Sequence, residues 1–284
     1  MIELTEYLVR GVLIGVTYGL LAYPISLLYV ATGTVDLAVG SYAVLAGATA
    51  MALPAPLGLV VAVFIAVVAA SSVGLASTAL NRRRGGDALA SVLASFGFAI
   101  ILESVVLTGF GKDPMVRQQF GSFWSLMGIR VSPQAAVNVA TGFAILGGVF
   151  LLLYRTPWGR VLRASAVNPR GATLAGIPVA SVQFSAYLLS GVLAGIAGCL
   201  VLYTSGLDFA SGLPLTLKSL GAAILFGLGN PLRAFYGGVA IGVVEALSVG
   251  YAPQSIGTLL PYVFIFLVLC TASASRAGVH GMRA

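Results

Sequence analysis

Long uncharged apolar runs recur along this chain and limit what it can fold into. Residues 11–30 are twenty consecutive residues without a charge, which is the length that an α-helix needs to cross the hydrocarbon core of a bilayer. Hydrophobic residues make up 59% of the chain and charged residues 8%, and the mean hydropathy is +1.03. This composition excludes an ordinary soluble domain. Because backbone polar groups in lipid must be satisfied within their own segment, we expect an all-α, polytopic transmembrane helix bundle.

Charged and turn-forming residues divide the chain into about nine apolar segments. The expected range is about eight to ten membrane segments, with possible broken or re-entrant helices among them. We expect a single transmembrane domain over residues 1–284. The segments are 11–30, 41–53, 57–80, 88–110, 134–154, 183–205, 215–229, 233–250 and 256–272.

The positions of the basic residues predict an orientation. Ten of the fifteen Lys and Arg residues fall in 82–84, 155–170, position 233 and the C-terminal tail. Lys and Arg are in excess in cytoplasmic loops, so we expect the C-terminus inside and the N-terminus outside. The net charge of +7 is explained by this asymmetry in a protein surrounded by membrane lipid. Nucleic-acid binding is therefore not expected.

Few residues in this chain carry reactive chemistry. His280 is its only histidine, and Cys199 and Cys270 lack Cys-x-x-Cys spacing, so no catalytic residue, metal site or disulfide framework is expected. No Gly-x-x-x-x-Gly-Lys loop for nucleotide phosphates is present. We therefore expect a chain that is not an enzyme and binds no cofactor. If nucleotide hydrolysis drives transport through such a bundle, the ATPase is a separate chain.

Residues 155–182 interrupt the apolar pattern with four arginines. They contain a short helix with recognisable ends: Asn168 suits the N-cap, Pro169 the first helical position, and Gly176 a left-handed C-terminal position. A helix of about seven residues is marginal alone, so we expect docking to stabilise it. Two interpretations are open, a cytoplasmic coupling helix seated in a partner protein and an amphipathic connector lying on the bilayer. The apolar face expected to dock consists of Ala172, Leu174, Ala175 and Ile177.

Ionisable residues within apolar segments need a compensating role, because each costs about 2.5 to 3.5 kcal/mol on insertion scales. Asp36 lies in residues 33–41, where two glycines and an acid interrupt one hydrophobic stretch. It could line a translocation path at a helix break, together with Gly40 and Ser41, or cap the next helix at the cytoplasmic interface. Glu103 could line the same path or form a structural hydrogen bond to a neighbouring helix.

The second half of the chain offers further candidates. Residues 215–229 are short for a full crossing and carry Lys218, which predicts a half-helix or a helix strongly buried in protein. Short or broken spans of this kind tend to lie beside transport sites. Glu245 lies within the following span and is also placed on the path. Asp208 falls in a turn expected at the outer mouth.

Glycines spaced four residues apart predict close helix packing. The two clearest faces are Gly11, Gly15 and Gly19 in the first segment, and Gly238 and Gly242 in the eighth.

Three stretches resemble the LivH-type permeases of bacterial branched-chain amino acid ABC importers, and the resemblance covers most of the chain. They are Thr-Pro-Trp-Gly-Arg with the Asn168 to Ile177 helix, Ser-Phe-Gly-Phe-Ala-Ile-Ile-Leu-Glu at 95–103, and Phe-Gly-Leu-Gly-Asn-Pro at 226–231 followed by 236–247. One stretch departs from the pattern. An Asn-Phe-Ala-His-Gly-like string is usual there, whereas this chain has Asp-Leu-Ala-Val-Gly at 36–40, which is closer to ribose-type sugar permeases.

The resemblance implies a permease subunit of an ABC importer that translocates a small polar solute, with branched-chain or other amino acids as the expected substrate. Urea, amides, aromatic acids and sugars are the alternatives. It implies two ATPase subunits that hold ATP and Mg, a second homologous permease chain, an extracytoplasmic solute-binding protein, and a bacterial inner membrane. An ion-coupled secondary transporter that uses its acidic residues is the rival hypothesis. Residues expected to couple to the ATPase are Arg163, Asn168, Arg170, Ala172, Leu174, Gly176 and Ile177.

Overall fold

The apolar segments form helices in the computed structural model, which describes residues 2–84, 88–117, 124–126, 129–131, 133–257 and 259–281. Seven helices of this described part are long and apolar enough to cross a membrane, and two shorter apolar helices accompany them. The expected helical bundle is confirmed. The long helices are α1 (Ile2–Thr32), α3 (Leu57–Arg84), α4 (Ala88–Phe110), α5 (Pro133–Arg155), α8 (Val179–Thr204), α9 (Gly212–Phe226) with the 3-10 turn η1 (Phe209–Ser211) before it, and α10 (Pro231–Tyr251).

Shorter elements complete the described chain. The two short apolar helices are α2 (Val39–Ala52) and the first half of α12 (Leu260–Gly281). Two helices, α6 (Pro157–Val167) and α7 (Pro169–Leu174), follow α5, and α11 (Gln254–Gly257) precedes α12. A small antiparallel hairpin, β1 (Trp124–Leu126) with β2 (Ile129–Val131), lies in the connection between α4 and α5.

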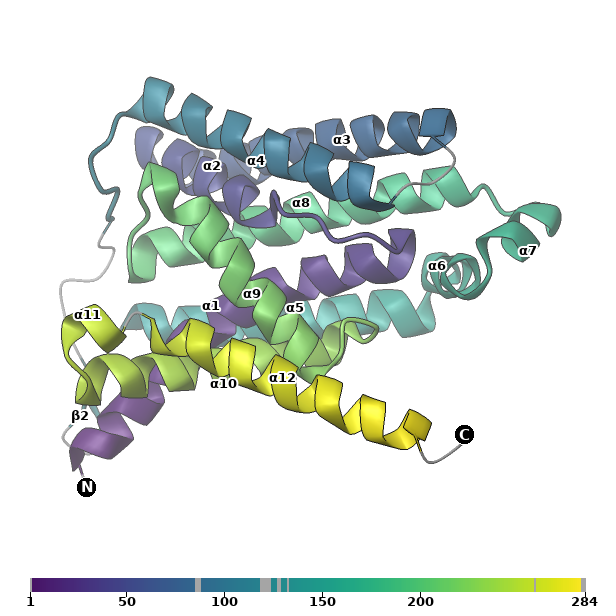
Figure 1. Ribbon diagram of the computed structural model, residues 1–284. Coiled ribbons are helices and arrows are strands. Elements are labelled where there is room, and N and C mark those ends of the chain that lie inside the picture. Colours follow the sequence, from purple (N-terminus) through teal and green to yellow (C-terminus); the bar gives the residue numbers. More distant parts are fainter. Residues whose placement is uncertain are drawn as a thin grey trace.

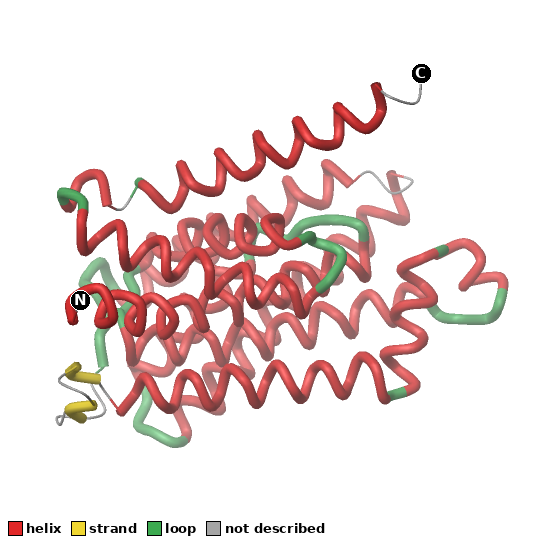
Figure 2. Tube along the Cα trace, turned by 90° about the horizontal axis from the view of Figure 1, so that it is seen from below, coloured by secondary structure: helices red, strands yellow, loops and turns green. Residues whose placement is uncertain are grey.

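The helices run between two distinct ends of the bundle. The N-terminus, the hairpin and α11 lie at one end, and α6, α7 and the last turn of α12 lie at the other (Figures 1 and 2). We call these the hairpin end and the α7 end. The two termini thus lie at opposite ends, as the alternation of apolar segments and basic loops predicts. Some of the basic residues used to predict the orientation cannot be placed, because the side chains of residues 82–84 and all of residues 282–284 lie outside the described part.

Glycines bring α1 and α10 into backbone contact. A Cβ added to Gly238 would overlap the backbone of Gly19, and one added to Gly242 would overlap the backbone of Gly15. Gly11 continues the contact, since a Cβ there would lie 2.6 Å from the Cα of Val243. The two glycine faces expected from the sequence therefore pack on each other, which fixes α10 beside α1.

The chain makes one of its crossings with a broken helix. After α1 ends at Thr32, residues 33–38 are not helical, and α2 begins only at Val39. Helix α2 occupies the half of the bundle nearer the hairpin end (Figure 1). Every residue from Val39 to Ala50 is buried. The interruption expected at 33–41 is confirmed, and it places the start of a helix inside the bundle.

Candidate translocation site and coupling loop

The carboxylate of Asp36 accepts two hydrogen bonds from residues at the start of α2. The backbone N–H of Ala38 donates to Asp36 Oδ1 at 2.8 Å, and the hydroxyl of Tyr42 donates to Oδ2 at 2.9 Å. The free N–H groups at a helix start need such acceptors, above all away from water. Asp36 is only 2% exposed. Asp36 thus satisfies one free N–H at the start of α2 from inside the bundle. The N-cap of α2 is Ala38, however, and it has no side-chain cap hydrogen bond, so the prediction that Asp36 is the N-cap at an interface was wrong.

Two other elements also accept hydrogen bonds from this helix break. The N–H of Leu37 donates to Ser95 Oγ of α4 at 3.1 Å, and that of Gly40 donates to Thr216 Oγ1 of α9 at 2.8 Å. A Cβ on Gly40 would overlap the carbonyl oxygen of Gly212, and the buried Ser41 packs against the same residue. Gly40 and Ser41 are thus packed against α9 in this conformation, while their place on the path stays a prediction.

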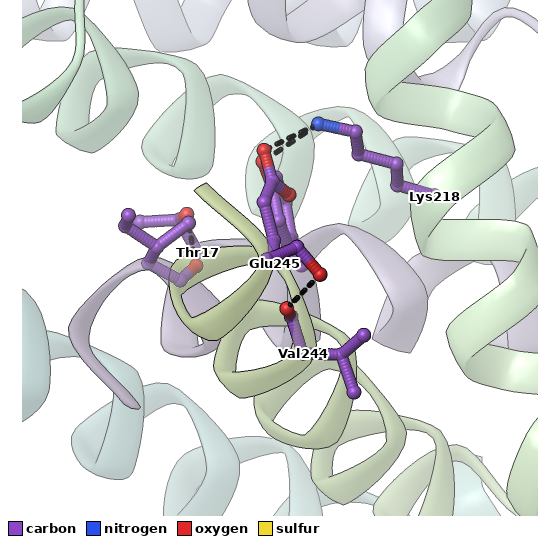
Figure 3. Close-up of polar contacts among 7 residues, drawn as sticks. Thr17, Lys218, Val244 and Glu245 are labelled. Atoms are coloured by element: carbon purple, nitrogen blue, oxygen red, sulfur yellow. Dashed lines mark hydrogen bonds and ion pairs between the residues drawn. The ribbon is translucent and has the colours of Figure 1, made fainter. Parts of the chain in front are cut away.

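Lys218 and Glu245 form an ion pair between α9 and α10. Lys218 Nζ lies 2.7 Å from Glu245 Oε1, and the two side chains are 14% and 18% exposed. Figure 3 shows them pointing toward each other, with Thr17 of α1 on the far side of Glu245. Lys218 Nζ also donates to the hydroxyl of Tyr18 at 3.2 Å and lies 5.9 Å from the ring centroid of Tyr262 on α12. Four helices therefore meet at this pair.

A cavity of about 330 Å³ lies between Lys218 and the turn that precedes α9. Asp208 lines its other side and accepts a hydrogen bond from Ser211 Oγ at 2.5 Å. The exposed Asp208 and the largely covered Lys218 thus share one cavity, although the sequence placed them separately at a mouth and on a path. The lining also includes Tyr18, Ser205, Pro214 and Leu215.

The connection that follows α4 closes over the same region. Met115 and Leu207 exchange backbone hydrogen bonds of 2.7 and 2.9 Å, which ties this connection to the cavity rim. Arg117 donates from Nη1 to the carbonyls of Ala50 and Leu53 at 2.9 and 3.0 Å. Arg117 thus caps the C-terminal end of α2. Sequence reasoning missed this role, because residues more than sixty positions apart meet only in the fold.

Glu103 does not join either polar group. Its side chain is half-buried on α4, and no hydrogen bond or ion pair to it is formed within the described ranges. The structural hydrogen bond that one interpretation expected is therefore not found there. Its position on the translocation path stays a prediction.

The short helix at the α7 end has the expected ends. Asn168 Oδ1 accepts from the N–H of Gly171 at 2.9 Å, and Pro169 is the first residue of α7. Gly176 has φ +82°. The N–H groups of Gly176 and Ile177 donate to the carbonyls of Thr173 and Ala172, each at 3.0 Å, which is the Schellman arrangement. The predicted N-cap, first position and left-handed glycine are confirmed.

The expected apolar face of this helix is divided. Ala172 is 6% exposed and Ile177 packs against the core, whereas Leu174 is 91% exposed. The prediction of a single docking face was therefore wrong, because the Schellman turn directs Ala172 and Ile177 toward the protein. Leu174, with Ala175 and Arg170 beside it, points outward.

Helix α6 was not expected, although a signal was present. Thr156 caps it by accepting from the N–H of Gly159 at 3.2 Å, and Pro157 takes the first position, which is the same signal that identified α7. Arg163 on α6 donates to the carbonyl of Leu153 and lies 4.8 Å from the ring centroid of Tyr154. Arg163 thus fixes α6 to the end of α5, and its coupling to an ATPase stays a prediction.

These features define a class of protein. The helices cross the membrane, and one crossing is broken. A polar cavity lies beside an ion pair between two of these helices, and two capped helices project from one end. These are features of a membrane transport protein. No group of His, Cys, Asp and Glu in the described residues could hold a metal ion. The chain belongs to the family described as "Branched-chain amino acid transport system / permease component", whose model matches residues 7–269. It is therefore the permease component of an ABC transporter, which acts with ATPase subunits.

Individual relatives are similar to this chain over most of their length. The chain is 28% identical to a probable branched-chain amino acid transport permease LivH of Methanocaldococcus jannaschii, over 93% of this chain and 88% of the relative. It is 25% identical to the high-affinity branched-chain amino acid permease BraD of Pseudomonas aeruginosa, over 93% and 92%. The L-arabinose ABC transporter permease AraH of Azospirillum brasilense is 29% identical, over 84% of this chain and 68% of the relative.

Proposed function

We propose that this chain is a permease subunit of an inner-membrane importer that moves branched-chain or other amino acids. It would work with two ATPase subunits, a second, homologous permease chain and an extracytoplasmic solute-binding protein. The ATPases would hold ATP and Mg, and this chain would bind no cofactor. The observation that carries the proposal is the capped α6–α7 projection, which presents Leu174 as an exposed apolar contact residue. The names of the LivH and BraD relatives support the substrate class.

The contacts of α6 and α7 suit the transmission of movement. Arg163 joins α6 to the end of α5, and Trp158 Nε1 donates to Ser185 Oγ of α8 at 2.8 Å. A push on α7 would therefore reach two membrane helices together. ATP binding would close the partner ATPases, move residues 155–182 as the coupling loop, and shift the bundle between inward-open and outward-open states.

The proposed function predicts which side of the membrane each end of the bundle faces. The α7 end would face the cytoplasm, with the C-terminus on that side. The hairpin end, with Asp208 and the exposed Lys112 at its surface, would receive solute from the binding protein. The cavity next to Lys218 would then lie on the outer side of the path.

A sugar is the second candidate substrate. The Asp-Leu-Ala-Val-Gly string at 36–40 and the similarity to an arabinose permease favour it. Competition of radiolabelled leucine uptake by unlabelled amino acids and by pentoses separates the two. Inhibition by amino acids alone supports the amino-acid importer.

Gly176→Val tests the coupling role against a matched control. A β-branched residue at φ +82° strains the turn after α7, by at least about 1–2 kcal/mol. Gly111 directly follows the last residue of α4 and has φ +87°, with nothing within 4 Å of an added Cβ. Gly111→Val therefore strains the backbone to a similar degree, but far from α7. We expect Gly176→Val to abolish ATP-driven uptake while the complex still hydrolyses ATP. Gly111→Val should retain uptake. Equal uptake by both variants would contradict the proposal.

A further inference from the structure

The cavity beside Lys218 has the size of a small-solute site. Its volume of about 330 Å³ lies at the lower end of the range for ligand pockets. Its walls come from α1, α8, η1 and α9. Elements that are far apart in the sequence therefore enclose it, and a relative movement of these helices would change its shape.

Lys218 has hydrogen-bonding capacity left at this cavity. A protonated lysine carries three N–H donors, and the described contacts use two of them, to Glu245 Oε1 and to the Tyr18 hydroxyl. The side chain also lines the cavity. A third donor is thus available to an acceptor that enters the cavity, and a carboxylate would form the strongest such bond.

Glu245 has an acceptor atom that lacks a hydrogen-bond donor. Its Oε2 atom is buried and has no hydrogen-bond partner within the described part of the chain. A buried carboxylate oxygen without a donor is costly. Glu245 is not among the residues that line the cavity, whereas its partner Lys218 is. A donor from the cavity therefore reaches Oε2 only when the lysine side chain moves aside, and it then stands close to the lysine ammonium.

We propose that this ion pair binds the head group of a zwitterionic α-amino acid, with the solute carboxylate on Lys218 and the solute ammonium on Glu245. The inference rests on the proposed function, because it names how this chain recognises that class of solute. An α-amino acid carries both charged groups on one carbon atom, so it can meet two adjacent, opposite protein charges. In the empty site Lys218 and Glu245 neutralise each other; in the occupied site each neutralises one solute charge.

The remaining walls suit an apolar side chain. Val201, Leu207, Pro214 and Leu215 line the cavity together with the charged and hydroxyl groups. The hydroxyls of a neutral sugar can donate a hydrogen bond to a carboxylate oxygen, but a sugar has no charges to replace both partners of the ion pair. The site therefore selects amino acids with apolar side chains over sugars.

The test uses protection of a cysteine in the complete, purified transporter complex. Ser205 lines the cavity and is exposed, so Ser205→Cys in a Cys270→Ser background reports occupancy through its labelling by a small methanethiosulfonate. Three probes compete: leucine, leucinamide, which lacks the carboxylate, and 4-methylpentanoate, which lacks the ammonium. We expect leucine to protect at about 10- to 100-fold lower concentration than the other two, as suits the loss of one charge-assisted hydrogen bond.

Two variants test which protein residue contacts each charged group of leucine. Lys218→Met should remove the preference for leucine over leucinamide, and Glu245→Gln should weaken the preference for leucine over 4-methylpentanoate. Equal protection by all three probes, no protection by leucine, or unchanged preferences in both variants would overturn the inference. If neither variant assembles, the comparison of the three probes on the unmutated pair decides alone. Uptake of leucine by the wild-type complex is measured separately, so failure of the proposed function is distinguished from failure of this site.

Discussion

Gly238→Ala should loosen the contact between α1 and α10. An added Cβ would overlap the N and Cα atoms of Gly19 and lie 2.6 Å from the carbonyl carbon of Tyr18. Ordinary contact begins near 3.4 Å, so the two backbones must separate by roughly 1 Å in a close-packed interior. Overpacking of this kind costs about 1–3 kcal/mol. The gain in helix propensity offsets about 0.5–1 kcal/mol of it, and the midpoints of the two ranges give a net loss of about 1 kcal/mol.

Gly148→Ala is the matched control, because an alanine at this position of α5 meets nothing within 4 Å. Only the propensity gain applies there. Thermal unfolding can be followed with a thiol-reactive dye in a Cys270→Ser background, where the buried Cys199 reports unfolding. At about 2–4 °C per kcal/mol, Gly238→Ala should lower the Tm by about 2–4 °C, and Gly148→Ala should leave it unchanged or raise it. Equal shifts in the two variants would refute the packing argument.

Three further substitutions test other contacts. Arg117→Met leaves the carbonyls of Ala50 and Leu53 without their donor, so the same dye assay should show a loss of about 1–3 kcal/mol; an unchanged Tm would mean that water replaces the guanidinium. Asp36→Ala removes the acceptor of Ala38 and Tyr42 and should lower the Tm clearly more than Asp36→Asn, which keeps an acceptor oxygen; equal effects would show that charge, not hydrogen bonding, matters. Asn168→Ala should weaken α7 by about 0.5–2 kcal/mol and speed hydrogen exchange of the Gly171 amide without altering the Tm, and unchanged exchange would contradict the N-cap role.

Local chemistry made parts of this structure predictable. The ends of α7 follow from Asn168, Pro169 and Gly176, because a cap depends on neighbours within a few residues. The crossings follow from apolar length, and the glycine faces of α1 and α10 follow from a four-residue spacing. The same local logic applied to Thr156 and Pro157 would have found α6.

Contacts between distant segments were not predictable in the same way. Lys218 and Glu245 were each expected on the path, yet no sequence pattern pairs residues on successive helices that run in opposite directions. Arg163 was expected to contact an ATPase and Arg117 was given no role, while the fold uses both to bind carbonyls at helix ends. The outward orientation of Leu174 also depends on how the Schellman turn packs, which the composition of α7 does not determine.

The most direct test of the central claim is a cross-link from Leu174 to an ATPase. Leu174→Cys is introduced into a chain whose native cysteines are replaced by serine, and the complex is purified from its native membrane through a C-terminal tag. A short cysteine- and lysine-reactive cross-linker should join this position to an ATPase subunit, identified by mass spectrometry, with a yield that changes when ATP binds. Free labelling of this cysteine by a bulky maleimide in the assembled complex, with no ATPase adduct, would contradict the account.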